Sequence, residues 1–149
     1  LNGALTLGTM DGANVEIAEL AGAKNIYTFG KDSESIIKLY ETAGYVSKDY
    51  YKKDKHIKRA VDFILDSTLV KLGNEERLKR LHDELLNKDW FMTLIDFDAY
   101  VTAKEQILAD YEDQDSWNKK VIHNIAKAGF FSSDRTIAQY NTDIWHCED

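Results

Sequence analysis

The sequence has no proline and only one cysteine among its 149 residues. The commonest interruption of a helix is therefore missing, so long helical stretches are permitted. The single thiol, Cys147, excludes an intrachain disulfide and fits a reducing, cytoplasmic compartment. No H-E-x-x-H motif and no i, i+4 pair occurs among the four histidines, which are His56, His82, His123 and His146. A zinc site therefore has little support.

Basic residues and long apolar runs are also scarce. Nineteen Lys and Arg stand against twenty-six Asp and Glu, and the formal net charge of −7 argues against a nucleic-acid partner. No apolar run approaches the roughly 18 residues that span a bilayer, so no membrane partner is expected. Hydrophobic residues nevertheless make up 44% of the chain. A chain of this size buries roughly 70% of its unfolded surface, which predicts one folded domain.

The first thirty residues have the pattern of an α/β unit. Residues 4–9 read as a strand, residues 12–21 as a helix capped by Asp11 and ended by Gly22, and residues 25–29 as a second strand. Strand, helix and strand in this order predict a βαβ unit with parallel strands and a right-handed crossover. Parallel strands normally lie in larger sheets, so we expect further strands in a longer chain, upstream of this sequence.

From Lys31 onward the hydrophobic spacing is helical. The predicted helices carry these stripes and end signals: Ile36, Ile37 and Tyr40 before Gly44; Ile57, Ala60, Val61, Ile64 and Leu65; Leu78, Leu81 and Leu85 after Asn74; Tyr100, Val101, Ile107 and Leu108 after Asp96 or Asp98; Trp117, Val121, Ile122 and Ile125 between Asp115 and Gly129; and Ile137, Tyr140 and Ile144 after Ser132 or Ser133. The predicted class is thus α/β and predominantly helical. We expect residues 1–149 to pack as one unit, with a βαβ part over 1–30 and a helical remainder over 31–149.

The segment from Gly8 to Gly12 is the first candidate site. It joins a strand to a helix, where free backbone N–H groups and the helix dipole can hold a phosphate. Its glycine spacing matches neither G-x-G-x-x-G nor the P-loop, and Asp11 would satisfy the same donors while repelling an anion. We interpret it as a capped turn. Asn14 and Glu16 could face a ligand, although Glu16 also suits the dipole of a helix N-terminus.

Other clusters have a structural interpretation beside the functional one. An acidic group lies at predicted helix ends, where acids cap helices, and it lacks the Ca²⁺-loop spacing: Asp96, Asp98, Asp110, Glu112, Asp113 and Asp115. A set of aromatic residues could stack on sugar rings but is more typical of a core: Trp90, Trp117, Trp145, Phe130 and Phe131.

Arg135 stands beside Ser132, Ser133 and Asp134 at a predicted helix start. An anion clamp and an intramolecular cap or ion pair explain this arrangement equally well. Cys147, between His146 and Glu148, has no neighbouring base or oxyanion donor, so it is predicted to be an inert thiol. From these residues we predict no catalytic, cofactor-binding or metal-binding residue in this chain.

Two long strings resemble the α-glucan phosphorylases, the family of glycogen, starch and maltodextrin phosphorylases. Residues 1–17, LNGALTLGTMDGANVEI, look like the segment that directly follows the lysine carrying pyridoxal phosphate in that family. Residues 117–145, which include FSSDRTIAQY, look like its C-terminal pair of helices. Similar text occurs between them at 25–30, 45–51 and 96–106. The resemblance covers essentially the whole chain.

The resemblance implies a fold, a reaction and a cofactor. The chain would be the C-terminal part of the second Rossmann-like domain of a two-domain GT-B-type glycosyltransferase, and hence a fragment. The parent would be a cytoplasmic homodimer that cleaves α-1,4-glucan with phosphate, releasing glucose 1-phosphate. Its pyridoxal 5'-phosphate lysine would lie just upstream of Leu1, with Asn2 and Gly3 near the cofactor.

The resemblance also implies what the chain lacks. None of Lys24, Lys31, Lys38 or Arg135 matches the residues that hold phosphate in the family. The fragment alone is therefore expected to bind no cofactor and to be inactive. Two alternatives stay open at this point: a stand-alone helical interaction module, and the C-terminal part of a nucleotide-sugar glycosyltransferase.

Overall fold

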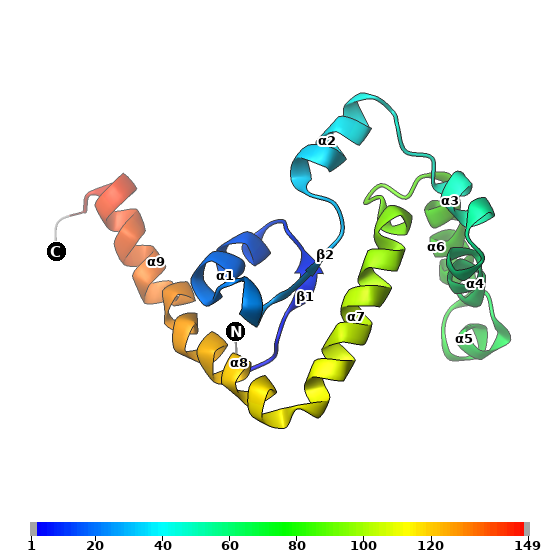
Figure 1. The fold of residues 1–149 in the computed structure, drawn as a ribbon. Coiled ribbons are helices and arrows are strands. Elements are labelled where there is room, and N and C mark those ends of the chain that lie inside the picture. Colours follow the sequence, from blue (N-terminus) through cyan, green and yellow to red (C-terminus); the bar gives the residue numbers. More distant parts are fainter. Residues whose placement is uncertain (1–2, 148–149) are drawn as a thin grey trace. The chain divides into compact units, whose positions relative to one another are not determined.

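The computed structural model describes residues 3–147, which form two compact units (Figure 1). The first unit takes in the described residues up to Thr28 and those from Lys104 on, and the second unit is Phe29–Ala103. Leu1 and Asn2 lie outside the described residues, so of the two residues placed near the cofactor above only Gly3 is described. That residues 1–149 pack as a single unit stays a prediction.

Both short strands lie near the start of the chain, and helices follow them. The first stretch contains β1 (Leu7–Thr9), α1 (Ala13–Ala21), the 3-10 turn η1 (Ala23–Asn25) and β2 (Tyr27–Phe29). Then come α2 (Ser33–Glu41), α3 (Ser47–Lys53), α4 (Lys55–Phe63), α5 (Ser67–Leu72), α6 (Glu75–Asn87), the turn η2 (Thr93–Asp96) and α7 (Phe97–Glu112). The chain continues with α8 (Gln114–Lys127), the turn η3 (Ala128–Phe131), α9 (Ser133–Tyr140) and the π-helical turn η4 (Asn141–Trp145).

The predicted α/β class is confirmed in its coarse form. β1 and β2 pair in a two-stranded parallel sheet, with α1 between them along the chain (Figure 1). Gly22 ends α1 with a φ of 80°, a conformation that glycine adopts without strain. β1 begins at Leu7 rather than at residue 4, because β2 offers only three residues for pairing. The two-domain GT-B arrangement stays a prediction.

The core of the first unit lies where α1 and α8 meet. Ile17 and Ala21 on α1 are buried together with Ile26, which precedes β2. α8 contacts both α1 and η1. Burying an isoleucine side chain contributes roughly 1.5–3 kcal/mol, so these few residues hold the strand–helix–strand segment against α8.

The core of the second unit is built by α4 and η2. Ile57 and Val61 on α4 are buried with Leu94, and the rings of Tyr50, Tyr51 and Phe97 pack around them together with Leu86. The predicted α4 stripe is confirmed at Ile57 and Val61, whereas Ala60 is exposed. Asn74 caps α6 as predicted, because its side-chain oxygen accepts a hydrogen bond from the Arg77 amide at 3.0 Å.

Several apolar residues that were predicted to face inward lie on the surface. Ile122 and Ile144 are 65% and 63% exposed, and Leu81, Ile125, Ile137 and Tyr140 are exposed as well. The prediction was wrong for these residues because helical spacing identifies an apolar face but not the element that covers it. Within the described residues this face of α8, α9 and η4 remains open to solvent.

The end of α2 differs from the prediction that Gly44 closes it. Ala43 adopts the left-handed conformation, with a φ of 50°. The Gly44 amide donates to the Leu39 carbonyl at 3.0 Å, which is the long hydrogen bond of a Schellman motif with Ala43 at C′. Gly44 therefore occupies the next position, and the strained conformation falls on a residue that has a Cβ.

Replacing Ala43 with glycine is expected to stabilise the protein. The relieved left-handed strain outweighs the added freedom of the unfolded chain, so the free energy of unfolding should rise by roughly 0.5 kcal/mol. The same change at Ala60, exposed inside α4, should lower it by about 1 kcal/mol. Urea denaturation of both variants measures this pair. A destabilised Ala43→Gly variant would contradict the assignment of the cap.

Candidate functional site

The corner between β1 and α1 is the candidate phosphate loop of the sequence. Asp11 was predicted to cap α1, and this prediction was wrong. The helix begins after Gly12, which has a φ of 49°, and no side chain caps it. The Asp11 carboxylate instead accepts a hydrogen bond from the Thr9 hydroxyl at 2.9 Å. The Asp11 side chain thus bonds the last residue of β1 and not the first turn of α1.

The Asn14 side chain is hydrogen-bonded within the same corner. Its side-chain amide donates to the Thr9 carbonyl at 2.8 Å. A Cβ at Gly8 would approach Asn14 Cγ to 3.3 Å, so glycine allows the strand to pass this side chain. Glu16 is exposed in the first turn of α1, where its charge suits the helix dipole. The corner is therefore a hydrogen-bonded turn with a negative charge, which disfavours phosphate.

A polar cluster that sequence reasoning missed connects β2 to α7 and α8. The Tyr27 hydroxyl donates to Asp110 Oδ2 at 2.7 Å, and Lys120 Nζ donates to both Tyr27 (2.8 Å) and Asp110 (2.9 Å). Lys120 Nζ lies 4.7 Å from the centroid of the Tyr27 ring, on which Trp117 also stacks. We call Tyr27, Asp110 and Lys120 the polar triad.

The polar triad shifts the titration of its own members. Burial, and then the Asp110 carboxylate, raise the pKa of Tyr27 against the opposing effect of Lys120. The hydrogen bonds from Tyr27, Lys120 and Gln106 lower the pKa of Asp110 to about 2. Hydrogen bonds with Tyr27 and Asp110 raise the pKa of Lys120. A lysine held in its protonated form is a poor nucleophile, so the cluster is an ion pair that fixes structure.

Asn124 lies beside this cluster on the same face of α8. Its side chain is buried, with 2% of the residue exposed, and its amide donates to the Asn25 carbonyl at 2.8 Å. A second hydrogen bond goes to the Lys120 carbonyl at 2.9 Å. A buried amide that satisfies a carbonyl 99 residues away joins the two ends of the first unit.

Three of the six acidic residues have structural partners and three are exposed, which fits the interpretation as caps and solvated charge. Asp113 caps α8 by accepting from the Ser116 amide at 3.2 Å. Asp96 accepts from the Lys31 amide at 3.1 Å. Asp110 belongs to the polar triad, whereas Asp98, Glu112 and Asp115 are exposed. No set of three or more potential metal-ligating residues comes together within residues 3–147.

The aromatic residues divide into two groups. Trp117 is half-buried against Tyr27 and Tyr111, and Phe130 packs edge-on against Phe131. Trp90, Trp145 and Phe130 are 64%, 51% and 40% exposed, so the core prediction was wrong for them. No described ring stacks on Trp90, whereas Trp145 contacts Tyr140 edge-on.

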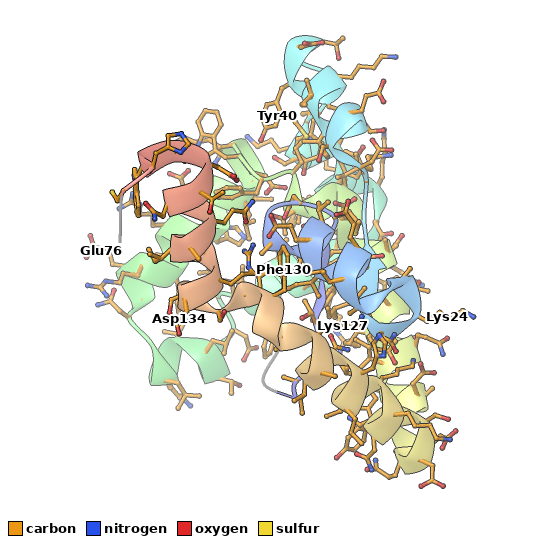
Figure 2. The ribbon with its side chains drawn as sticks, turned by 90° about the vertical axis from the view of Figure 1, so that its left-hand side faces the viewer. Lys24, Tyr40, Glu76, Lys127, Phe130 and Asp134 are labelled. Atoms are coloured by element: carbon orange, nitrogen blue, oxygen red, sulfur yellow. The ribbon has the colours of Figure 1, made fainter. Side chains whose placement is uncertain are left out.

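Arg135 shows which of its two interpretations holds within the described residues. Its guanidinium lies 3.8 Å from the centroid of the Phe130 ring, bonds the Phe130 carbonyl, and donates to Gln139 Oε1 at 2.6 Å. Figure 2 shows Phe130 on the turn before α9, with Asp134 pointing outward at the start of that helix. Ser132 caps α9 through the Arg135 amide at 3.3 Å. The Arg135 guanidinium therefore binds groups of its own turn and helix, which supports the intramolecular interpretation over an anion clamp.

The remaining sequence candidates lie apart from one another. His82 approaches two carboxylates, Asp83 at 3.5 Å and Asp62 at 3.9 Å, on the contact of α6 with α4. Cys147 carries an exposed free thiol, and its backbone amide donates to Asn141 Oδ1 at 2.7 Å. The prediction that no catalytic or cofactor-binding residue lies in this chain stays a prediction.

The two-stranded parallel sheet and the mostly helical remainder define an α/β segment. A sequence model of the family described as carbohydrate phosphorylase matches residues 1–147. Maltodextrin phosphorylase of Streptococcus pneumoniae is 65% identical over 146 residues, which are 98% of this chain and 19% of that protein. Glycogen phosphorylase of Bacillus subtilis is 42% identical over 97% of this chain and 18% of its own length. The brain form of glycogen phosphorylase from Ovis aries is 45% identical over 99% of this chain and 17% of its own length.

The chain belongs to the carbohydrate phosphorylase family. It spans about a fifth of the length of these relatives. The family that the two long strings indicated is therefore confirmed.

The polar triad predicts how acid affects stability. Because the pKa of Asp110 is lower in the fold than its ordinary value of 3.8, the carboxylate stabilises the fold above that value. This stabilisation is lost as the pH falls toward about 2. The melting-temperature difference between the wild type and Asp110→Asn should therefore be full at pH 6 and shrink between about pH 4 and pH 2. Asp115→Asn, at an exposed site on α8, is the control. A difference that stays constant to pH 2 would contradict the triad.

Proposed function

We propose that this chain is part of an α-glucan phosphorylase, which uses inorganic phosphate to cleave the terminal α-1,4 bond of a glucan and releases glucose 1-phosphate. The observation that carries this proposal is the family match over residues 1–147, together with 65% identity to a protein named maltodextrin phosphorylase. The name of that relative also suggests the substrate class, a glucan of α-linked glucose.

The chain's own part in such an enzyme is support. Our proposal places it at the C-terminal end of the second Rossmann-like domain, as the string FSSDRTIAQY suggests. In that position β1 extends the backbone that leaves the cofactor lysine. α8 holds η1 through Asn124 and β2, the strand paired with β1, through the polar triad. Rigid elements of this kind hold reacting groups in place from a distance.

The exposed apolar face of α8, α9 and η4 supports a chain that packs against more polypeptide. Ile122, Ile137 and Ile144 are each more than half exposed, and burying one such side chain contributes roughly 1.5–3 kcal/mol. The relatives are about five times longer than this chain and so have polypeptide to cover the face. We expect the chain alone to have no phosphorylase activity.

Pyridoxal phosphate is part of the proposal for the full-length protein only. A lysine that forms a Schiff base must lose its proton, whereas hydrogen bonds to Tyr27 and Asp110 raise the pKa of Lys120. Asp11 places a carboxylate at the start of α1, where a cofactor phosphate would otherwise bind. Neither Lys120 nor the corner at Asp11 therefore fits the cofactor, and we place its lysine upstream of Leu1.

The setting of the parent enzyme follows the same proposal. We place it in the cytoplasm as a homodimer that binds glucan and phosphate, with neither a nucleic acid nor a membrane as partner. Among the described helices, none combines the length and the apolar character that crossing a membrane requires.

The test is glucose 1-phosphate formation from a maltooligosaccharide and phosphate. The full-length protein that carries this chain should form the product when loaded with pyridoxal phosphate, and the 149-residue chain should form none. A full-length protein that needs a nucleotide sugar instead of phosphate would contradict the proposal, and so would activity of the isolated chain.

A further inference from the structure

A cavity of about 470 Å³ lies in the second unit, between the loop before α3, the start of α4 and η2. Cavities of this size are typical of small-molecule sites. Its floor is formed by Ile57 and Leu94, two buried residues of the core, together with Ile95. The half-buried ring of Tyr50 adds to the lining. An apolar floor of this kind binds a ligand that has a C–H face.

The rim of the cavity is polar and carries both signs of charge. Asp49 and Lys53 lie on α3, and Asp98 lies in the first turn of α7. All three side chains are exposed, and no hydrogen bond or ion pair joins any of them to another described side chain. The fourth charged group, Asp54, is already occupied because it caps α4 through the His56 and Ile57 amides at 2.6 and 3.1 Å.

The walls of the cavity are held in place by a buried carboxylate. Asp89 accepts hydrogen bonds from the Thr93 and Leu94 amides, both at 3.0 Å, and from the Tyr45 hydroxyl. Burial and the nearby Asp89 raise the pKa of Tyr45, so its hydroxyl stays a donor. Through these bonds Asp89 fixes η2, which carries two floor residues, to the loop beside the cavity mouth. The cavity is thus a preformed feature rather than a gap between loose segments.

We propose that this cavity holds a short stretch of α-1,4-glucan, an inference that rests on the proposed function. Sugar hydroxyls both donate and accept hydrogen bonds. They match a rim that offers two accepting carboxylates and one donating ammonium. The C–H face of a glucose ring matches the aliphatic floor and Tyr50. An ion of either sign would meet a like charge on this mixed rim, whereas a neutral polyol meets none.

The test is hydrogen–deuterium exchange on the full-length protein that carries this chain, with maltoheptaose as the probe. Peptides covering residues 44–54 and 92–99 should exchange about tenfold more slowly at a maltoheptaose concentration ten times Kd, because the bound ligand opposes local opening of these segments. The β-linked cellohexaose should have no such effect. The combined change Asp49→Asn and Asp98→Asn keeps the shape of the rim and should weaken the protection. Asp115→Asn on α8 is the matched control and should retain it.

The outcomes separate this inference from the proposed function when glucose 1-phosphate formation is measured on the same preparations. Product formation without protection of the two peptides would overturn the cavity proposal alone. Protection without product would overturn the proposed function alone. Protection that is unchanged in the double variant would place the glucan elsewhere and overturn the proposal. So would protection by spermidine in place of maltoheptaose, because the cavity would then be a cation site.

Discussion

One buried amide joins the two ends of the first unit. Asn124, which is buried, donates to the carbonyl of half-buried Asn25 from a position 99 residues further along the chain. A buried carbonyl without a partner costs about 1–3 kcal/mol, so this bond strongly favours one arrangement of α8 on the strand–helix–strand segment. The polar triad then reinforces that arrangement from the neighbouring turn of α8.

The chain combines well-defined local structure with apolar surface that is exposed to solvent. Its small cores and its caps define each unit, yet several large apolar residues of α8, α9 and η4 face solvent. The relatives are about five times as long as this chain, and we propose that further polypeptide covers this apolar face in the full-length protein. Under the proposed function, the corner at Gly8 and the Asn124 hydrogen bond hold structure around chemistry that lies outside this chain.

Local signals predicted some helix ends correctly, although they failed at Asp11 and Gly44. Gly22 ends α1, and Asn74 and Ser132 cap helices, because each effect depends on a residue and its next few neighbours. The polar triad could not be predicted, since Tyr27 and Lys120 are 93 residues apart and nothing in their spacing reveals the contact. The prediction that one face of α8 and of α9 is buried failed for a different reason. Periodicity identifies an apolar face, whereas burial depends on another element that covers it.

The central claim is that Asn124 holds the strand–helix–strand segment on α8, and urea denaturation of Asn124→Leu tests it most directly. Leucine keeps the branched shape of the side chain and removes the donor, so the Asn25 carbonyl loses its partner and the free energy of unfolding should fall by about 1–3 kcal/mol. Asn118→Leu, at an exposed site on the same helix, should change it by less than about 0.5 kcal/mol. Equal stability of the two variants would contradict the account.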